Sequence, residues 1–106
     1  MAAPTIADTL AAAARGEPAV TARPSDDGGV EYVLVGRPFA ELEAGGLAAS
    51  FRLSSAVAAA AVRTPDVVPS GRGTGWVTIR PTEVDAHAID RMNAWFESAR
   101  RLAGGA

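Results

Sequence analysis

The C-terminal part of the chain constrains the fold most strongly, because a short strand pattern runs directly into a long amphipathic helix. Apolar residues recur there at helical spacing across residues 83–102, namely Val84, Ala88, Met92, Trp95, Phe96, Ala99 and Leu102. Thr82-Glu83-Val84-Asp85 is typical of a helix cap at the start of this pattern, and Gly104-Gly105 follows its end. A helix with so wide an apolar stripe needs a broad apolar partner, and we expect it to lie across a β-sheet.

The segment before this helix predicts a strand over residues 76–80. Val77 and Ile79 share one face of such a strand, which leaves Trp76, Thr78 and Arg80 on the other face. If the helix covers the valine face, the tryptophan face is turned away from it. This second face is the part of the sequence that comes closest to indicating a function.

Turn residues and periodicity predict the remaining elements. In chain order these are a helix over 6–15 capped by Thr5, a hairpin of strands 20–23 and 30–35, an extended segment 39–42, a strand 47–53, a short helix 56–63 and an extended segment 66–69. We therefore predict an α+β domain over residues 1–106, with its core at about 5–102. A largely antiparallel sheet of four to five strands carries an N-terminal helix, a short middle helix and a long C-terminal helix.

Composition excludes several classes of site. The chain of 106 residues is 48% hydrophobic, which is sufficient for one compact core. It contains no cysteine and a single histidine, His87, so disulfides, thiolate catalysis and multi-histidine metal sites are excluded. The first residues lack a basic region and a sustained apolar run, and no window is long and apolar enough to cross a membrane. We expect a cytoplasmic protein with no cofactor, no bound metal and no membrane partner.

The charged residues argue against a general nucleic-acid binder. All ten basic residues are arginine, and twelve acidic residues give a net charge of −2. Non-specific affinity for nucleic acids depends mainly on neutralising phosphates with a basic surface. An acidic chain without lysine is a poor match to that requirement.

Four motifs carry a resemblance to known families: Ala19–Pro24, Gly28–Tyr32, Gly36–Ala40 and Gly75–Arg80, the last followed by the final helix. In these motifs and in the order of its elements the chain resembles two small bacterial families. One is labelled as a luciferase domain, and the other is the MmcQ/YjbR-like group, often described as DNA-binding.

The resemblance implies the fold more than the function. The luciferase-labelled family tends to place histidines after its glycine-arginine turn and again before its Gly-Trp strand. This chain has Glu41, Glu43, Val67 and Val68 in those neighbourhoods, so a site built on those histidines does not carry over. From the MmcQ/YjbR-like group, the resemblance implies a DNA-binding role that the charge balance opposes.

The predicted binding residues centre on the tryptophan face of the last strand. Ser50 and Arg52 of the 47–53 strand are expected beside Trp76 and Arg80, and a tryptophan among arginines is typical of recognition surfaces. The full set of binding candidates is Trp76, Thr78, Arg80, Arg52, Arg37 and Arg72. The alternative is that Trp76 fills a gap beneath the first helix or a loop, as large aromatic side chains usually do.

Three further features have both a functional and a structural interpretation. The backbone amides of the glycine-rich segment 71–75 could bind an anion. However, the segment lacks the lysine of a phosphate-binding loop and leads into a strand, which is typical of an ordinary connection between strands. Glu41 and Glu43 share one strand face. They could be a catalytic carboxylate pair, or they could simply belong to a solvent-exposed face of the strand. His87, near Glu83, could bind a metal weakly or move a proton, or could simply be a surface histidine.

These observations leave three functional hypotheses. The first is a non-enzymatic binding or accessory domain that presents its sheet face, or the groove beside the last helix, to a protein or a small ligand. A homodimer through the Trp76 face is one form of this hypothesis. The second is nucleic-acid binding, which gains support if the candidate arginines cluster on one face and loses it if acids lie among them. The third is a small enzyme using Glu41, Glu43 or His87, which requires a pocket that joins them.

Overall fold

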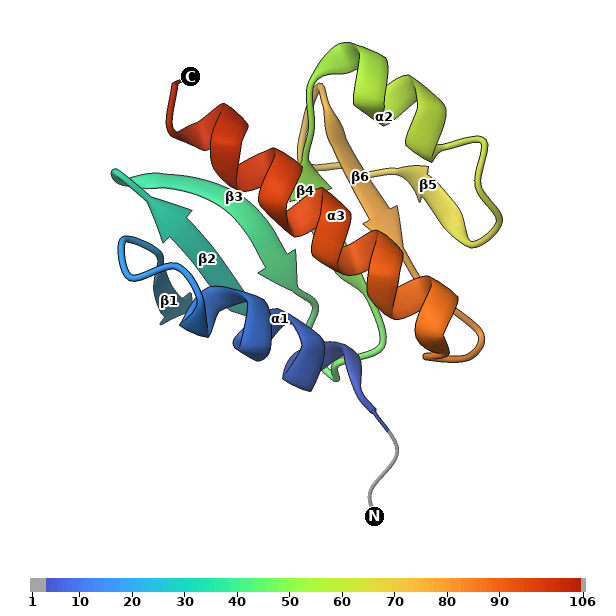
Figure 1. Cartoon of the computed structure of the whole chain (residues 1–106), viewed down its shortest axis with the longest axis horizontal. Helices are drawn as coiled ribbons and strands as arrows, with labels where there is room; N and C mark the ends of the chain where they lie inside the picture. Colours follow the sequence, from blue (N-terminus) through green and yellow to red (C-terminus); the bar gives the residue numbers. More distant parts are fainter. Residues whose placement is uncertain (1–3, 106) are drawn as a thin grey trace.

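The predicted order of helices and strands is present in the computed structural model, which describes residues 4–105 (Figure 1). The elements are α1 (Ile6–Arg15), β1 (Thr21–Pro24), β2 (Val30–Leu34), β3 (Arg37–Leu42), β4 (Ala49–Arg52), α2 (Ser55–Ala61), β5 (Val67–Pro69), β6 (Trp76–Ile79) and α3 (Ala86–Ala103). Our prediction for the first residues of the chain rests in part on residues 1–3, which lie outside the described residues. Among residues 4–105, no helix combines the length and apolarity needed to cross a membrane.

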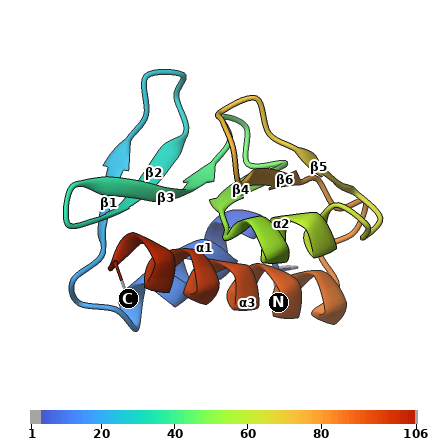
Figure 2. The same ribbon diagram turned by 90° about the horizontal axis from the view of Figure 1, so that it is seen from above.

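The six strands form one antiparallel sheet in the order β1-β2-β3-β4-β6-β5. The three helices lie on the same side of this sheet (Figure 2). The α+β class is confirmed, but the sheet has six strands where we expected four to five. The difference arises at the edge, since β5 is only three residues long and is defined by its pairing with β6 rather than by a periodicity of its own.

The core lies between the sheet and helices α1 and α3. Phe96 on α3 is 1% exposed and makes edge-to-face contacts with Tyr32 and Phe39, with ring centroids 5.5 and 5.1 Å apart. Phe51 on β4 lies against Trp95 in the same way, at 6.3 Å. Most of the predicted apolar stripe of the last helix therefore faces the sheet, but Val84 precedes the helix, and Ala103 is buried at its end where we expected Leu102. The aromatic residues of the stripe hold the two layers together.

Side-chain caps determine where the helices begin. The Oγ1 of Thr5 accepts a hydrogen bond from the Asp8 amide at 3.0 Å, as the capping motif predicts. Asp85 accepts one from the Ala88 amide at 2.8 Å, so α3 begins at Ala86 and not at residue 83. The residues before Asp85 belong to the connection from β6, because the N-cap residue itself has extended backbone angles.

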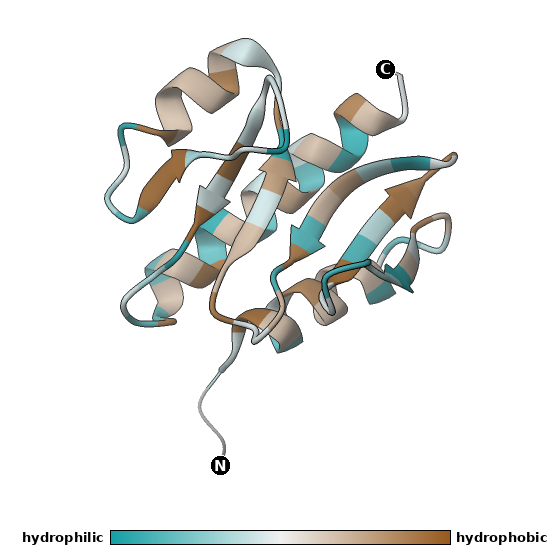
Figure 3. Cartoon of the chain, turned by 180° about the vertical axis from the view of Figure 1, so that it is seen from behind, coloured by the Kyte–Doolittle hydropathy of each residue, from teal (hydrophilic) through white to brown (hydrophobic). Residues whose placement is uncertain are grey.

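The side of the sheet opposite the helices is uncovered by any helix (Figure 3). Cross-strand register places Glu31 opposite Glu41, Glu41 opposite Ser50, and Ser50 opposite Thr78 in one row on this open face. The β2–β3 turn at one end of the sheet contains Val35, whose φ of 51° is rare for a β-branched residue. Since the helices bury the other side, any site formed by the sheet must use the open face.

Candidate functional site: an arginine pocket on the open face of the sheet

The predicted face of the last strand is present. Trp76 pairs with Arg52 and Thr78 pairs with Ser50, so these four side chains lie on the open face. The Ser50 and Thr78 hydroxyls are hydrogen-bonded to each other at 2.8 Å. Thr78 therefore contributes to holding β4 and β6 together, and its hydroxyl already has a partner.

Trp76 is buried on this face, with 9% of its surface exposed. Of our two interpretations of Trp76, an exposed recognition residue or a side chain covered by the first helix or a loop, the structure agrees with cover by a loop. The covering group is the guanidinium of Arg72, which lies 4.3 Å from the centre of the tryptophan ring. Arg72 belongs to the connection between β5 and β6, so the cover comes from neither helix α1 nor α3.

The backbone before Trp76 requires a glycine. Gly75 has a φ of +84°, and a Cβ added there would stand 2.6 Å from the carbonyl oxygen of Leu53. The amide of Leu53 in turn donates to the carbonyl of Gly75 at 2.8 Å. This close approach of two backbones fixes the point at which β6 starts, and with it the position of Trp76.

Two carboxylates hold Arg72 in place. Its Nη1 donates to Glu41, and its Nη2 donates to Glu31 at 3.1 Å. Glu31 also accepts a hydrogen bond from Nε of Arg23 at 3.1 Å. Arg72 thus links the β5–β6 connection to strands β2 and β3 across the open face.

The two carboxylates differ in their pKa. Burial tends to raise the pKa of Glu31, but the hydrogen bonds from Arg72 and Arg23 outweigh it and the pKa is lowered. Burial raises the pKa of Glu41, and the opposing charge of Arg72 compensates only in part. Because burial outweighs the effect of its one arginine partner, Glu41 is the less firmly ionised carboxylate of the clamp, our name for Arg72 with Glu31 and Glu41.

Beside this clamp is an open pocket of about 390 Å³, which we call the arginine pocket. It is lined by Gly36, Arg37, Pro38, Arg52, Arg72 and Trp76. Within residues 4–105, neither Arg37 nor Arg52 forms an ion pair. Four of the six predicted binding residues therefore meet in one pocket, and two of them bring positive charges that no acidic side chain of the described chain neutralises.

The other two predicted residues do not line this pocket. Thr78 is bonded to Ser50, and the exposed Arg80 forms an ion pair with Glu43 at 2.9 Å. Sequence reasoning in turn missed Gly36 and Pro38 as lining residues. The Gly-Arg-Pro turn had been singled out as a family-like motif, but its position beside Trp76 depends on strand pairing that the sequence does not display.

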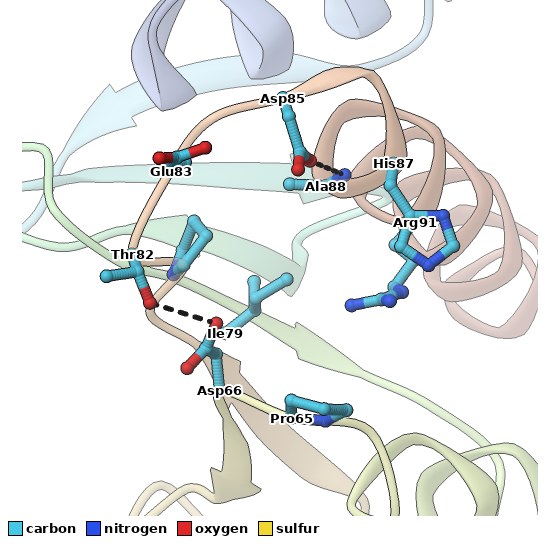
Figure 4. Close-up of a pocket in the computed structure, with 10 residues that line it drawn as sticks. Pro65, Asp66, Ile79, Thr82, Glu83, Asp85, His87, Ala88 and Arg91 are labelled. Atoms are coloured by element: carbon cyan, nitrogen blue, oxygen red, sulfur yellow. Dashed lines mark hydrogen bonds between the residues drawn. The ribbon is translucent and has the colours of Figure 1, made fainter.

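The acidic residues proposed for catalysis are not joined in a pocket with His87. Glu41 is bound to Arg72 and Glu43 to Arg80, so each acid has its own arginine. His87 is exposed at the start of α3, where it lines a separate pocket of about 260 Å³ with acids that include Asp66 and Glu83 (Figure 4). That pocket includes neither Glu41 nor Glu43, and among residues 4–105 no three histidine, cysteine, aspartate or glutamate side chains are grouped to hold a metal ion.

The glycine-rich segment 71–75 is a connection between β5 and β6, and several of its groups bond internally. The amide of Arg72 donates to the Ser70 hydroxyl at 3.2 Å, and the Trp76 amide donates to the Gly73 carbonyl at 3.2 Å. The segment leads into a strand and not into a helix N-terminus, so it lacks the dipole of a phosphate-binding loop. Its contribution to the site is the Arg72 side chain.

Comparison with known proteins adds no assignment: no protein-family model matches the chain, and no curated protein matches it either.

Proposed function

We propose that this chain is a non-enzymatic binding domain, and that the arginine pocket is where it takes the negatively charged group of a ligand. The observation that carries this proposal is the placement of Arg37 and Arg52, without acidic partners in the described chain, in one pocket with Arg72 and Trp76. Guanidinium groups with free donors are the protein groups best suited to bind carboxylates and phosphates.

The local charge supports an anionic ligand although the whole chain is acidic. Ligand recognition depends on the field within a few ångströms of the pocket, since water and salt screen charges that lie beyond about 10 Å. The pocket volume of about 390 Å³ falls within the ordinary range for small-molecule sites. A small ligand, or one side chain of a partner protein, fits these dimensions.

The other two hypotheses have less support. Acidic residues lie among the candidate arginines, because Glu31 and Glu41 bind Arg72 and Glu43 binds Arg80. This is the arrangement under which nucleic-acid binding loses support, and we expect no binding to duplex DNA tighter than roughly 10⁻⁴ M at physiological salt. An enzyme using Glu41, Glu43 or His87 lacks the shared pocket that it requires.

Self-association and cellular location remain predictions. A homodimer through the Trp76 face would now have to form over Arg72, because the tryptophan itself is buried. A cytoplasmic location, and the likeness to the luciferase-labelled and MmcQ/YjbR-like domains, rest on the sequence features alone.

A panel of small anions tests the proposal. Citrate, succinate, phosphate and pyrophosphate are each added at millimolar concentration, and the melting temperature and the heat of binding are measured. At least one anion should raise the melting temperature, since a ligand that binds only the folded state stabilises it. Arg52→Gln should remove most of this shift.

Arg63→Gln is the matched control. Arg63 is exposed, follows α2 and lies outside the arginine pocket, so its loss removes the same charge elsewhere. Equal binding by both variants, or no binding of any anion to the unmodified chain, would contradict the proposal.

A further inference from the structure

We infer that the arginine pocket recognises a doubly charged phosphoryl group, as carried by a phosphate monoester. This inference rests on the proposed function and specifies the ligand of the same pocket. It rests on the net charge of the site, which can be counted from the ion pairs that its charged side chains form.

The clamp beside the pocket, taken together with Arg23, is electrically neutral. Arg23 and Arg72 contribute two positive charges, and Glu31 and Glu41 contribute two negative charges through three ion pairs. Asp27 in the exposed β1–β2 turn also acts on this cluster through its charge, which adds to the effect of burial in raising the pKa of Glu41. Its Oδ1 accepts hydrogen bonds from Ser25 and Gly29, and among residues 4–105 it forms no ion pair and does not line the arginine pocket.

Arg37 and Arg52 are therefore the excess charge of the site. Both line the pocket, and neither has an acidic partner within residues 4–105. A ligand group with two negative charges neutralises this excess, whereas a carboxylate or a sulfate ester supplies one. A phosphate monoester carries close to two negative charges at neutral pH and has three oxygens that accept hydrogen bonds.

The geometry of guanidinium groups favours the same ligand. Each arginine can direct two parallel N–H donors at two oxygens of one phosphoryl group, so Arg37 and Arg52 together offer donors for all three oxygens. Arg72 borders the pocket as a third cation, but its Nη1 and Nη2 are already committed to Glu41 and Glu31. Among residues 4–105, Arg37 and Arg52 are therefore the pocket arginines whose donors are not used in ion pairs.

The decisive comparison is between phenyl phosphate and phenyl sulfate, measured by calorimetry on the full chain at pH 7.5. The two ligands share a ring and a tetrahedral group and differ in charge. Phenyl phosphate should bind at least about tenfold more tightly, because both ligands offer three oxygens but only the phosphate carries a second negative charge, which strengthens its hydrogen bonds from the two guanidinium groups. Equal affinities would overturn the inference.

Variants test whether the charge of this pocket is the cause. Arg52→Gln should reduce the preference for phosphate over sulfate to less than about threefold, while Arg63→Gln should leave it unchanged. Glu41→Gln should strengthen phosphate binding, since it frees Arg72 to face the ligand. Weaker phosphate binding by a folded Glu41→Gln variant would contradict the charge balance on which the inference depends.

The same experiment separates the inference from the proposed function. If succinate or phenyl sulfate binds as tightly as phenyl phosphate and Arg52→Gln weakens that binding, the anion site stands and phosphoryl recognition is overturned. If no anion binds, both fail. A phosphotyrosine peptide, tested beside phenyl phosphate, distinguishes a phosphorylated protein from a free metabolite as the source of the group, and tighter binding of either form supports phosphoryl recognition.

Discussion

Replacing Phe96 with alanine tests the packing on which the sheet and its open face depend. Phe96 is 1% exposed and meets the rings of Tyr32 and Phe39 edge to face. Truncating a buried phenylalanine costs about 3 to 5 kcal/mol, and each aromatic pair adds about 0.5 to 1.5 kcal/mol beyond its buried area. We therefore expect a loss near the upper end of the first range.

This loss is large relative to the whole stability of the domain. A chain of this length is stable by about 5 to 15 kcal/mol, and each kcal/mol lost lowers the melting temperature by about 4 to 8 °C. Phe96→Ala should thus lower the melting temperature by about 15 °C or more. Urea unfolding followed by circular dichroism measures the free energy directly.

Two further variants make the result interpretable. Phe96→Leu keeps much of the volume and should cost about 1 to 3 kcal/mol, which remains measurable if the alanine variant does not fold. Val68→Ala truncates a side chain that is 58% exposed on the edge strand, and it should change stability by less than about 0.5 kcal/mol. A loss below about 1 kcal/mol for Phe96→Ala would refute the packing argument, because no buried aromatic residue is so easily removed.

Three other predictions follow from particular residues. Val35→Asn should stabilise the domain by about 1 kcal/mol in thermal melts, since Val35 is 81% exposed and has a φ of 51° that asparagine tolerates far better; a fall in stability would refute the strain. Gly75→Ala should destabilise by about 2 kcal/mol or more, because the added Cβ would stand 2.6 Å from the Leu53 carbonyl oxygen at a φ of +84°, and wild-type stability in urea would contradict this. The hydrogen bond from Arg100 lowers the pKa of Glu97 from 4.5 to about 2, so its stabilisation is complete above pH 4.5 and is lost as the pH falls towards 2. Glu97→Gln should therefore make the melting temperature less sensitive to acid over this range, by a small amount because the side chain is partly exposed; an unchanged acid sensitivity would count against the ion pair.

Local patterns in the sequence predicted most of the elements but not all of their limits. Helical spacing of apolar residues located the long C-terminal helix, and its start moved from residue 83 to Ala86 because the side chain of Asp85 caps the helix. The edge strand β5 could only be seen as an extended segment. A strand of three residues has too little periodicity to identify it, and its hydrogen bonds to β6 are what make it a strand.

The candidate site, like the fold, could be predicted from the sequence only in part. Alternation along the last strand was enough to place Trp76 and Thr78 on one face, because successive side chains of a strand point to opposite sides whatever surrounds them. Whether Trp76 is exposed on that face was decided by the position of the nearby Arg72 side chain, which is held by Glu31 and Glu41 from distant parts of the chain. Arg72 comes from the connection after β5 and covers the tryptophan while binding Glu31 and Glu41 on two other strands.

The sequence by itself determined the set of charged residues and the strand faces on which they lie. Only the tertiary structure decided which of these charges are neutralised. Arg37, Arg52, Arg72 and Arg80 differ in their local sequence, which places them in a Gly-Arg-Pro turn, on predicted strands or in a glycine-rich segment, but the sequence does not show which of them has an acidic partner. Folding gives acidic partners to Arg72 and Arg80, and among the described residues gives none to Arg37 and Arg52. The physical reason is that an ion pair needs two groups within about 4 Å, and for residues more than 30 positions apart that proximity is a property of strand pairing and loop path alone.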